Sequence, residues 1–140
     1  MTHQQFHSSI INSATGKGVL RGTKRADQFT FDQYELLGGK TADKIIGFDS
    51  SQGDTIGVSA KVFSSLAGAG EISFASADTK TELKLLSKQD YDFVYLETNG
   101  RLFLNANGAD KGWGSADKGG LIAILKGKPE LSAEVFTILA

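Results

Sequence analysis

A β-hairpin at residues 91–108 is the strongest local constraint on the fold. The segment YDFVYLETNGRLFLNANG places alternating apolar runs on both sides of the pair Asn99–Gly100. Asn-Gly is the dipeptide preferred in the two-residue type I′ turn, whose twist matches that of the paired strands. The segment therefore predicts two antiparallel strands joined by a tight turn.

Several other short apolar runs are bounded by glycine, aspartate and serine, as short strands commonly are. The chain of 140 residues has 17 glycines and one proline, and glycine suits tight turns because it adopts positive φ without steric cost. A chain of this length forms one modest core, so we expect one mainly β domain. The expected strands lie at 28–31, 44–48, 55–59, 68–76, 119–127 and 135–140.

Short helical segments are expected between the strands. A capping box at Thr79 and Glu82 begins a helix predicted for 79–88. Residues 59–66 favour one or two helical turns, because their apolar side chains recur at helical spacing. Ser132 can cap one further turn. The sequence therefore predicts strands as the main element, with one or two short helices.

The composition limits the classes of function. The formal net charge of −1 gives no field that favours nucleic acid or an anionic membrane, so we expect no nucleic-acid partner. Cysteine is absent, which excludes disulfides, thiolate metal sites and thiol nucleophiles. Residues 1–17 are polar and weakly patterned, so we expect a flexible segment that is not a cleavable secretory signal. No stretch approaches the length of a transmembrane segment, and the protein is expected to be cytoplasmic or exported by a route that does not read its N-terminus.

The residues of enzymatic chemistry are sparse. His3 and His7 are the only histidines, which makes Ser-His-Asp catalysis implausible. No Asp or Glu lies in an apolar setting that would raise its pKa for glycoside hydrolysis. We therefore expect no enzymatic activity. Trp113 lies between two glycines and either offers a stacking platform to a sugar or packs over the sheet and covers the hairpin.

Aspartates and glycines are concentrated around the strands expected at 44–48 and 55–59. Asp43, Asp49 and Asp54 alternate there with three glycines. Two interpretations are open. The carboxylates can cap turns by accepting neighbouring backbone N–H groups, or they can contribute oxygen ligands to a cation such as Ca²⁺.

The segment GTKRADQFTF at 22–31 resembles the last, degenerate copy of the glycine- and aspartate-rich nonapeptide of RTX (haemolysin-type calcium-binding) proteins. Gly22, Asp27 and Phe29 match its first glycine, its aspartate and its apolar position. Residues 42–59 are similar to the segment that follows those repeats. The hairpin and the last strands resemble those that close such proteins, so the likeness covers about residues 20–140.

This resemblance implies a secreted C-terminal domain, here 18–140, that binds calcium outside the cell and carries an uncleaved signal for type I export. Arg25 and Thr23 stand where the nonapeptide has glycines, and Asn105 and Asn107 stand where the family has aspartates. Because ligand charge is one determinant of calcium affinity, we expect few or no bound ions. The resemblance makes Asp27 and Asp43 stronger ligand candidates than the others. The implied ligand set is Asp27, Asp43, Asp49 and Asp54.

The tail ELSAEVFTILA resembles a type I export signal, in which an acidic residue precedes apolar and hydroxyl residues. The same residues also suit an ordinary last strand, and both roles are compatible. The implied signal consists of Glu134, Val135, Phe136, Thr137, Ile138 and Leu139.

Together these features predict a small β-roll-derived sandwich or twisted sheet that acts as a non-enzymatic module. We expect it to be extracellular or at the cell surface and to use type I export machinery as its partner. The alternative is an extracellular adhesive or glycan-binding module that uses the loop around Trp113 and binds no calcium. A cytoplasmic structural protein without a ligand is a third interpretation.

Overall fold

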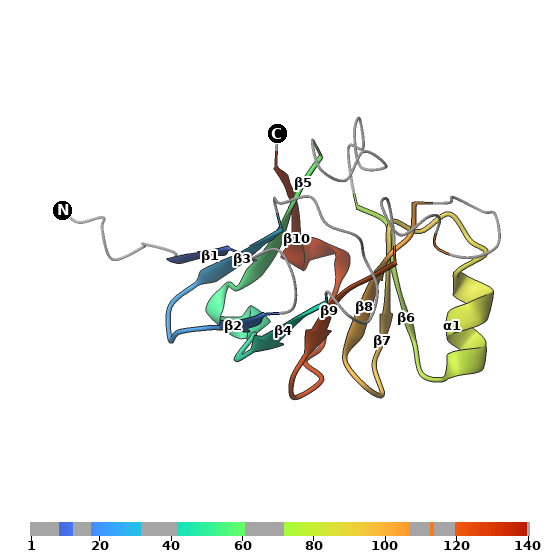
Figure 1. The fold of residues 1–140 in the computed structure, drawn as a ribbon, viewed down its shortest axis with the longest axis horizontal. Coiled ribbons are helices and arrows are strands. Elements are labelled where there is room, and N and C mark those ends of the chain that lie inside the picture. Colours follow the sequence, from blue (N-terminus) through green and yellow to red (C-terminus); the bar gives the residue numbers. More distant parts are fainter. Residues whose placement is uncertain are drawn as a thin grey trace.

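The computed structural model describes residues 9–12, 18–31, 42–60, 72–106, 113 and 120–139. These residues form two β-sheets and one α-helix (Figure 1). The predicted small β sandwich with a short helix is therefore confirmed. The first sheet has the order β1 (Ser9–Asn12), β3 (Asp27–Phe31), β5 (Thr55–Ser59) and β10 (Phe136–Leu139). The second sheet has the order β2 (Val19–Arg21), β4 (Asp43–Ile46), β9 (Gly120–Leu125), β8 (Arg101–Leu104), β7 (Phe93–Leu96) and β6 (Phe74–Ala77).

The chain alternates between the two sheets as it advances. Strands β1, β3 and β5 enter the first sheet, and β2 and β4 enter the second between them; β9 and β10 repeat this alternation. All pairings among these seven strands are parallel. This is the path of a coil in which each turn supplies one strand to each sheet and stacks on its neighbouring turns. Parallel pairing follows because successive turns run in the same direction.

An inserted unit lies between the coil strands β5 and β9. It contains β6, the helix α1 (Lys80–Leu86), β7 and β8, and it extends the second sheet. Strands β6 and β7 are parallel, with α1 as the crossover between them, whereas β8 runs antiparallel to β7 and β9. In the register, Asp43 faces Ala123 and Ile56 faces Phe136, so both pairings join residues 80 positions apart.

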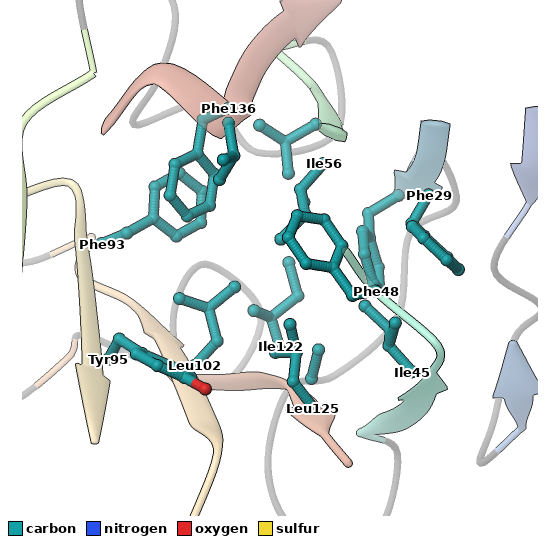
Figure 2. Packing of buried hydrophobic residues seen from close by; sticks show 14 of the residues in the cluster. Phe29, Ile45, Phe48, Ile56, Phe93, Tyr95, Leu102, Ile122, Leu125 and Phe136 are labelled. Carbon is teal, nitrogen blue, oxygen red and sulfur yellow. The ribbon is translucent and has the colours of Figure 1, made fainter. Parts of the chain in front are cut away.

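The apolar faces of the two sheets pack on each other to form one core (Figure 2). Phe29 and Ile56 enter it from the first sheet, and Ile45 enters from the second. Phe136 stacks on Phe93, with ring centroids 4.4 Å apart and planes 13° from parallel. This contact joins the last strand of the first sheet to the inserted unit.

The hairpin predicted at 91–108 is present, but its turn is not type I′. Leu96 pairs with Arg101, so four residues, 97–100, connect the strands. Among them only Gly100 has positive φ, at 73°, whereas a type I′ turn needs positive φ at both central residues. A two-residue loop would place Glu97 opposite Leu102 on the core face. The longer loop leaves that carboxylate exposed and avoids the cost of burying it.

The helix predicted at 79–88 is confirmed as α1. The Thr79 hydroxyl accepts the N–H of Glu82 at 3.1 Å, and the Glu82 carboxylate accepts the N–H of Asp78 at 2.7 Å. The return bond of the capping box therefore ends one residue earlier than the expected Thr79 N–H. Most of the helical segment expected at 59–66 lies outside the described residues.

The two ends of the described chain form strands. Ser9–Asn12 lie within the segment expected to be a flexible lead-in, yet they form β1 and pair with β3. Their pattern is too short to be distinguished from a loop in the sequence. Near the other end, a short 3-10 turn at Ala133–Val135 follows Ser132, whose side chain makes no capping bond to it. The predicted last strand is present as β10 and begins at Phe136, one residue after the predicted start.

Candidate functional site

Asp54 joins two successive turns of the coil. Its Oδ1 accepts the N–H of Asp27 at 2.8 Å, and its Oδ2 accepts the N–H of Asp49 at 2.8 Å. The first bond spans 27 residues of sequence, because Gln28 and Thr55 are paired in the sheet and the residues before them lie side by side. Both carboxylate oxygens of this buried side chain are therefore hydrogen-bonded to the backbone.

Asp43 has the corresponding position in the second sheet. Its Oδ1 accepts the N–H of Gly18 at 2.8 Å, and Val19 and Lys44, the residues that follow, are paired in β2 and β4. Asp43 and Asp54 thus follow one rule: a carboxylate at the start of a strand binds the backbone of the preceding coil turn.

A pair of glycines at the ends of β2 and β4 reinforces this stacking. The N–H of Gly22 donates to the carbonyl of Ile46 at 2.8 Å. A Cβ atom on Gly22 would lie 2.9 Å from the carbonyl oxygen of Gly47 and 3.3 Å from Oδ2 of Asp27. Close approach of the two turns therefore requires glycine at this position.

Asp27 and Asp49 complete the set of predicted ligand residues, and each one caps a local turn. The Asp27 carboxylate accepts the backbone N–H and the hydroxyl of Thr23. The Asp49 carboxylate accepts the N–H and the hydroxyl of Ser51, at 2.9 and 2.6 Å. The fold thus brings Asp27 and Asp49 to either side of Asp54, while Asp43 binds the separate backbone segment at Gly18.

The pKa values of two buried carboxylates are raised, so the expectation that no Asp or Glu lies in a setting that would raise its pKa is wrong. Burial raises the pKa of Asp43, although its hydrogen bond from Gly18 acts in the opposite direction. Burial also raises the pKa of Asp54, opposed by its two backbone hydrogen bonds and reinforced by the negative charges of Asp27 and Asp49. Calcium prefers six to eight oxygen ligands. Within the described ranges, no group of three or more Asp, Glu, His or Cys side chains is arranged to hold a metal ion.

Trp113 packs against the hairpin. Its ring stacks on Phe103 of β8, with centroids 4.8 Å apart and planes 12° from parallel. Its carbonyl accepts the N–H of Ala106 at 3.0 Å. One face of the indole is therefore used by the protein itself, which corresponds to the packing interpretation of this residue.

The predicted export signal forms the turn before β10 and β10 itself. Val135 and Phe136 are buried, Glu134 and Thr137 are exposed, and the last two signal residues are half-buried. Phe136 packs on Phe93 and also contacts Phe74 at a centroid distance of 5.5 Å. Among the described strands, β10 has one neighbour, β5, and so lies at an edge of the first sheet.

A group of acidic side chains lies beyond the ends of β6 and β7. A hydrogen bond to Asp78 raises the pKa of the exposed Glu97, and the charges of Asp78, Glu130 and Glu82 act in the same direction. Nothing in the local sequence marks these carboxylates, because they come from three separate segments. Only the parallel pairing of β6 with β7 places Asp78 beside Glu97.

Comparison with known proteins identifies no relative: no protein-family model, curated protein or solved structure matches the chain. In the part of the chain that the structure describes, no helix is long and apolar enough to cross a membrane.

Proposed function

We propose that the chain is a non-enzymatic RTX-like module that is exported by a type I route and works outside the cell or at its surface. The observation that most supports this proposal is the path of the chain, which alternates between two sheets through β1–β5 and again through β9 and β10. Short parallel strands from successive turns are what a Gly- and Asp-rich repeat builds when it forms a β-roll or β-helix.

The module needs few or no calcium ions to hold its turns together. Asp43 and Asp54 bind the backbone N–H groups of the preceding turn directly. A cation bound to either oxygen of Asp54, or to Oδ1 of Asp43, would have to compete with these hydrogen bonds for the same oxygens. The contact between turns that an ion would otherwise bridge is therefore made by the protein.

Melting curves in chelator and in millimolar Ca²⁺ test this part of the proposal. We expect a cooperative transition in chelator, because the hydrogen bonds between turns do not depend on an ion. A retained site would add about 2.7 kcal/mol at a calcium concentration about a hundred times its Kd, and titration calorimetry would count the ions. Unfolding in chelator, with refolding on addition of Ca²⁺, would contradict the proposal.

The tail has two roles in this proposal, and they belong to different states. In the folded protein, Val135 and Phe136 contribute to the core. During export the same segment is read in the unfolded chain. Glu134 and Thr137 are exposed in the folded state, so substitutions there change the signal with little effect on packing.

Export of the full chain from cells with a matching type I exporter tests the signal. We expect Glu134→Lys combined with Thr137→Lys to reduce export while leaving the melting temperature of the purified protein nearly unchanged. Phe93→Ala is the matched control, because it removes the stacking partner of Phe136 and leaves the tail sequence intact. It is expected to lower the melting temperature and to preserve export.

Two results would contradict the proposal that the tail is an export signal. The first is retention of the intact chain in cells whose exporter secretes its own substrate normally. The second is an equal loss of export for Phe93→Ala and for the tail variant, which would show that the segment matters only as a strand.

A further inference from the structure

The turn of the hairpin contains a chemically labile dipeptide. Asn99 is exposed and is followed by Gly100, which is buried. Asparagine followed by glycine is prone to deamidation, because glycine has no side chain to hinder attack by its backbone nitrogen. We propose that Asn99–Gly100 is a deamidation site that the folded hairpin protects, so that modification marks chains that have been unfolded.

The reaction needs only water as a co-reactant. The backbone nitrogen of Gly100 attacks Cγ of Asn99 and forms the N–Cγ bond of a five-membered succinimide. The bond from Cγ to the side-chain nitrogen breaks, and ammonia leaves with the proton lost from the Gly100 nitrogen. Water then opens the ring at either carbonyl, which gives aspartate or isoaspartate.

In the folded turn, the groups that would react are engaged in hydrogen bonds. The N–H of Gly100 donates to the carbonyl of Leu96 at 2.9 Å, and Oδ1 of Asn99 accepts the N–H of Arg101 at 3.1 Å. The carbonyl of Gly100 accepts the N–H of Leu125 at 2.7 Å. Attack on Cγ requires the peptide between the two residues and the Asn99 side chain to rotate, which breaks the bond from the Gly100 N–H to Leu96 and the bond from the Arg101 N–H to Asn99. Opening of the turn must therefore precede the reaction.

The surroundings of Gly100 also restrict such a rotation while the sheet is intact. A Cβ atom at Gly100 would overlap the carbonyl oxygen of Leu125 in the neighbouring strand β9. The backbone of β9 thus lies directly against the turn. Separation of the turn from β9 is the motion that releases Asn99 and Gly100.

The two products should behave differently on refolding. Aspartate keeps a carboxylate oxygen that can accept the Arg101 N–H. Isoaspartate routes the main chain through Cγ and lengthens it by one carbon in a loop that is fixed at four residues by the pairing of Leu96 with Arg101. The lengthened chain has no room to expand at Gly100, because β9 lies against it. Isoaspartate chains are therefore expected to refold poorly.

Trypsin digestion of the full-length protein allows the test. Cleavage after Lys88, Arg101 and Lys111 places Asn99–Gly100 on one peptide and the second Asn-Gly pair, Asn107–Gly108, on the next. Native protein and protein in guanidinium chloride are incubated at the same pH and temperature, and mass spectrometry follows both peptides. In the denatured chain, both peptides should become deamidated.

In the native protein we expect the Asn99 peptide to react at least about tenfold more slowly than in denaturant, a factor equivalent to an opening free energy of about 1.4 kcal/mol. Across the unfolding transition its rate should follow the unfolded fraction. A rate that is equal in native and denatured protein, or constant across the transition, would overturn the proposal. Asn99→Gln is the control, because its longer side chain disfavours the five-membered ring and should suppress the signal in both states.

Refolding provides the second readout. After incubation in denaturant, the protein is refolded, and the folded and aggregated fractions are separated. Isoaspartate should be depleted in the folded fraction relative to aspartate at Asn99. Equal proportions of the two products in both fractions would contradict the inferred steric limit at Gly100.

Discussion

Asparagine at position 54 is expected to destabilise the fold far more than asparagine at position 43. Both native carboxylates are buried, with exposed fractions of 2% for Asp54 and 1% for Asp43. Among the described residues, Asp54 accepts two backbone N–H groups, one on each oxygen, whereas Asp43 accepts one. An asparagine side chain has one acceptor oxygen and an amino group that only donates. Asp54→Asn therefore leaves one backbone N–H, the buried one of Asp27 or the part-buried one of Asp49, facing another donor.

The magnitude follows from this difference in acceptors. A buried donor without a partner costs about 1–3 kcal/mol. In Asp43→Asn the amide oxygen can keep the bond from Gly18, and the variant no longer carries a buried charge. We expect a loss of less than about 1 kcal/mol there. For a chain of this size, the extra loss at Asp54 corresponds to a melting temperature lower by about 3–5 °C per kcal/mol.

Denaturant titration of the two variants at neutral pH provides the assay. The denaturant midpoint of Asp54→Asn should be lower than that of Asp43→Asn, while the dependence of the unfolding free energy on denaturant stays equal. Equal dependence would show that the two variants differ in stability. Equal losses at the two positions, or a greater loss for Asp43→Asn, would refute the reasoning from hydrogen bonds. If both losses occurred only in the presence of calcium, the carboxylates would act as ion ligands and not as caps.

Three further outcomes are expected. Folding raises the pKa of Asp43 and Asp54 above the ordinary value of 3.8. Their contribution to stability is therefore fully present below that value and is lost as the pH rises through the folded pKa. The denaturant midpoint should accordingly change less with pH in the acid range for Asp43→Asn than for the native protein. Gly100→Val should cost at least about 2 kcal/mol, because positive φ strains a β-branched residue and Cβ would overlap β9; a near-native melting temperature would contradict this. Tyr95→Phe should cost about 0.5–1.5 kcal/mol by removing the 2.8 Å bond to the Pro129 carbonyl, and ultraviolet titration of the native protein should place the Tyr95 pKa at about 12.

Local patterns in the sequence predicted most of the elements. The run at 55–59 forms β5 with the predicted bounds, and the hairpin and α1 are present. These elements were predictable because alternation of apolar residues and capping boxes are encoded within a few residues. The turn at Asn99–Gly100 differs from the predicted type I′ turn because the cost of placing Glu97 on the core face outweighs the preference of the Asn-Gly dipeptide for that turn.

Contacts between coil turns were beyond the reach of local patterns. Asp54 binds Asp27 across 27 residues, and Asp43 binds Gly18 across 25. An aspartate beside glycine has the same local sequence whether it binds an ion, caps its own turn or binds the previous coil turn. Only the parallel register, which brings these strands together, distinguishes the three.

The 80-residue separation between paired strands has a consequence for the order of folding. Strands β2 and β4 are joined by closing a loop of 25 residues, from Val19 to Lys44, whereas β9 and β10 must each close a loop of 80. Loop-closure entropy makes the longer closure less favourable by about 1 kcal/mol, and non-local pairing slows folding. Among the coil strands, we therefore expect those before the inserted unit to pair with one another before β9 pairs with β4 and β10 pairs with β5. β10 should be among the last strands to gain protection from hydrogen exchange, so its residues remain accessible for the longest part of the folding reaction.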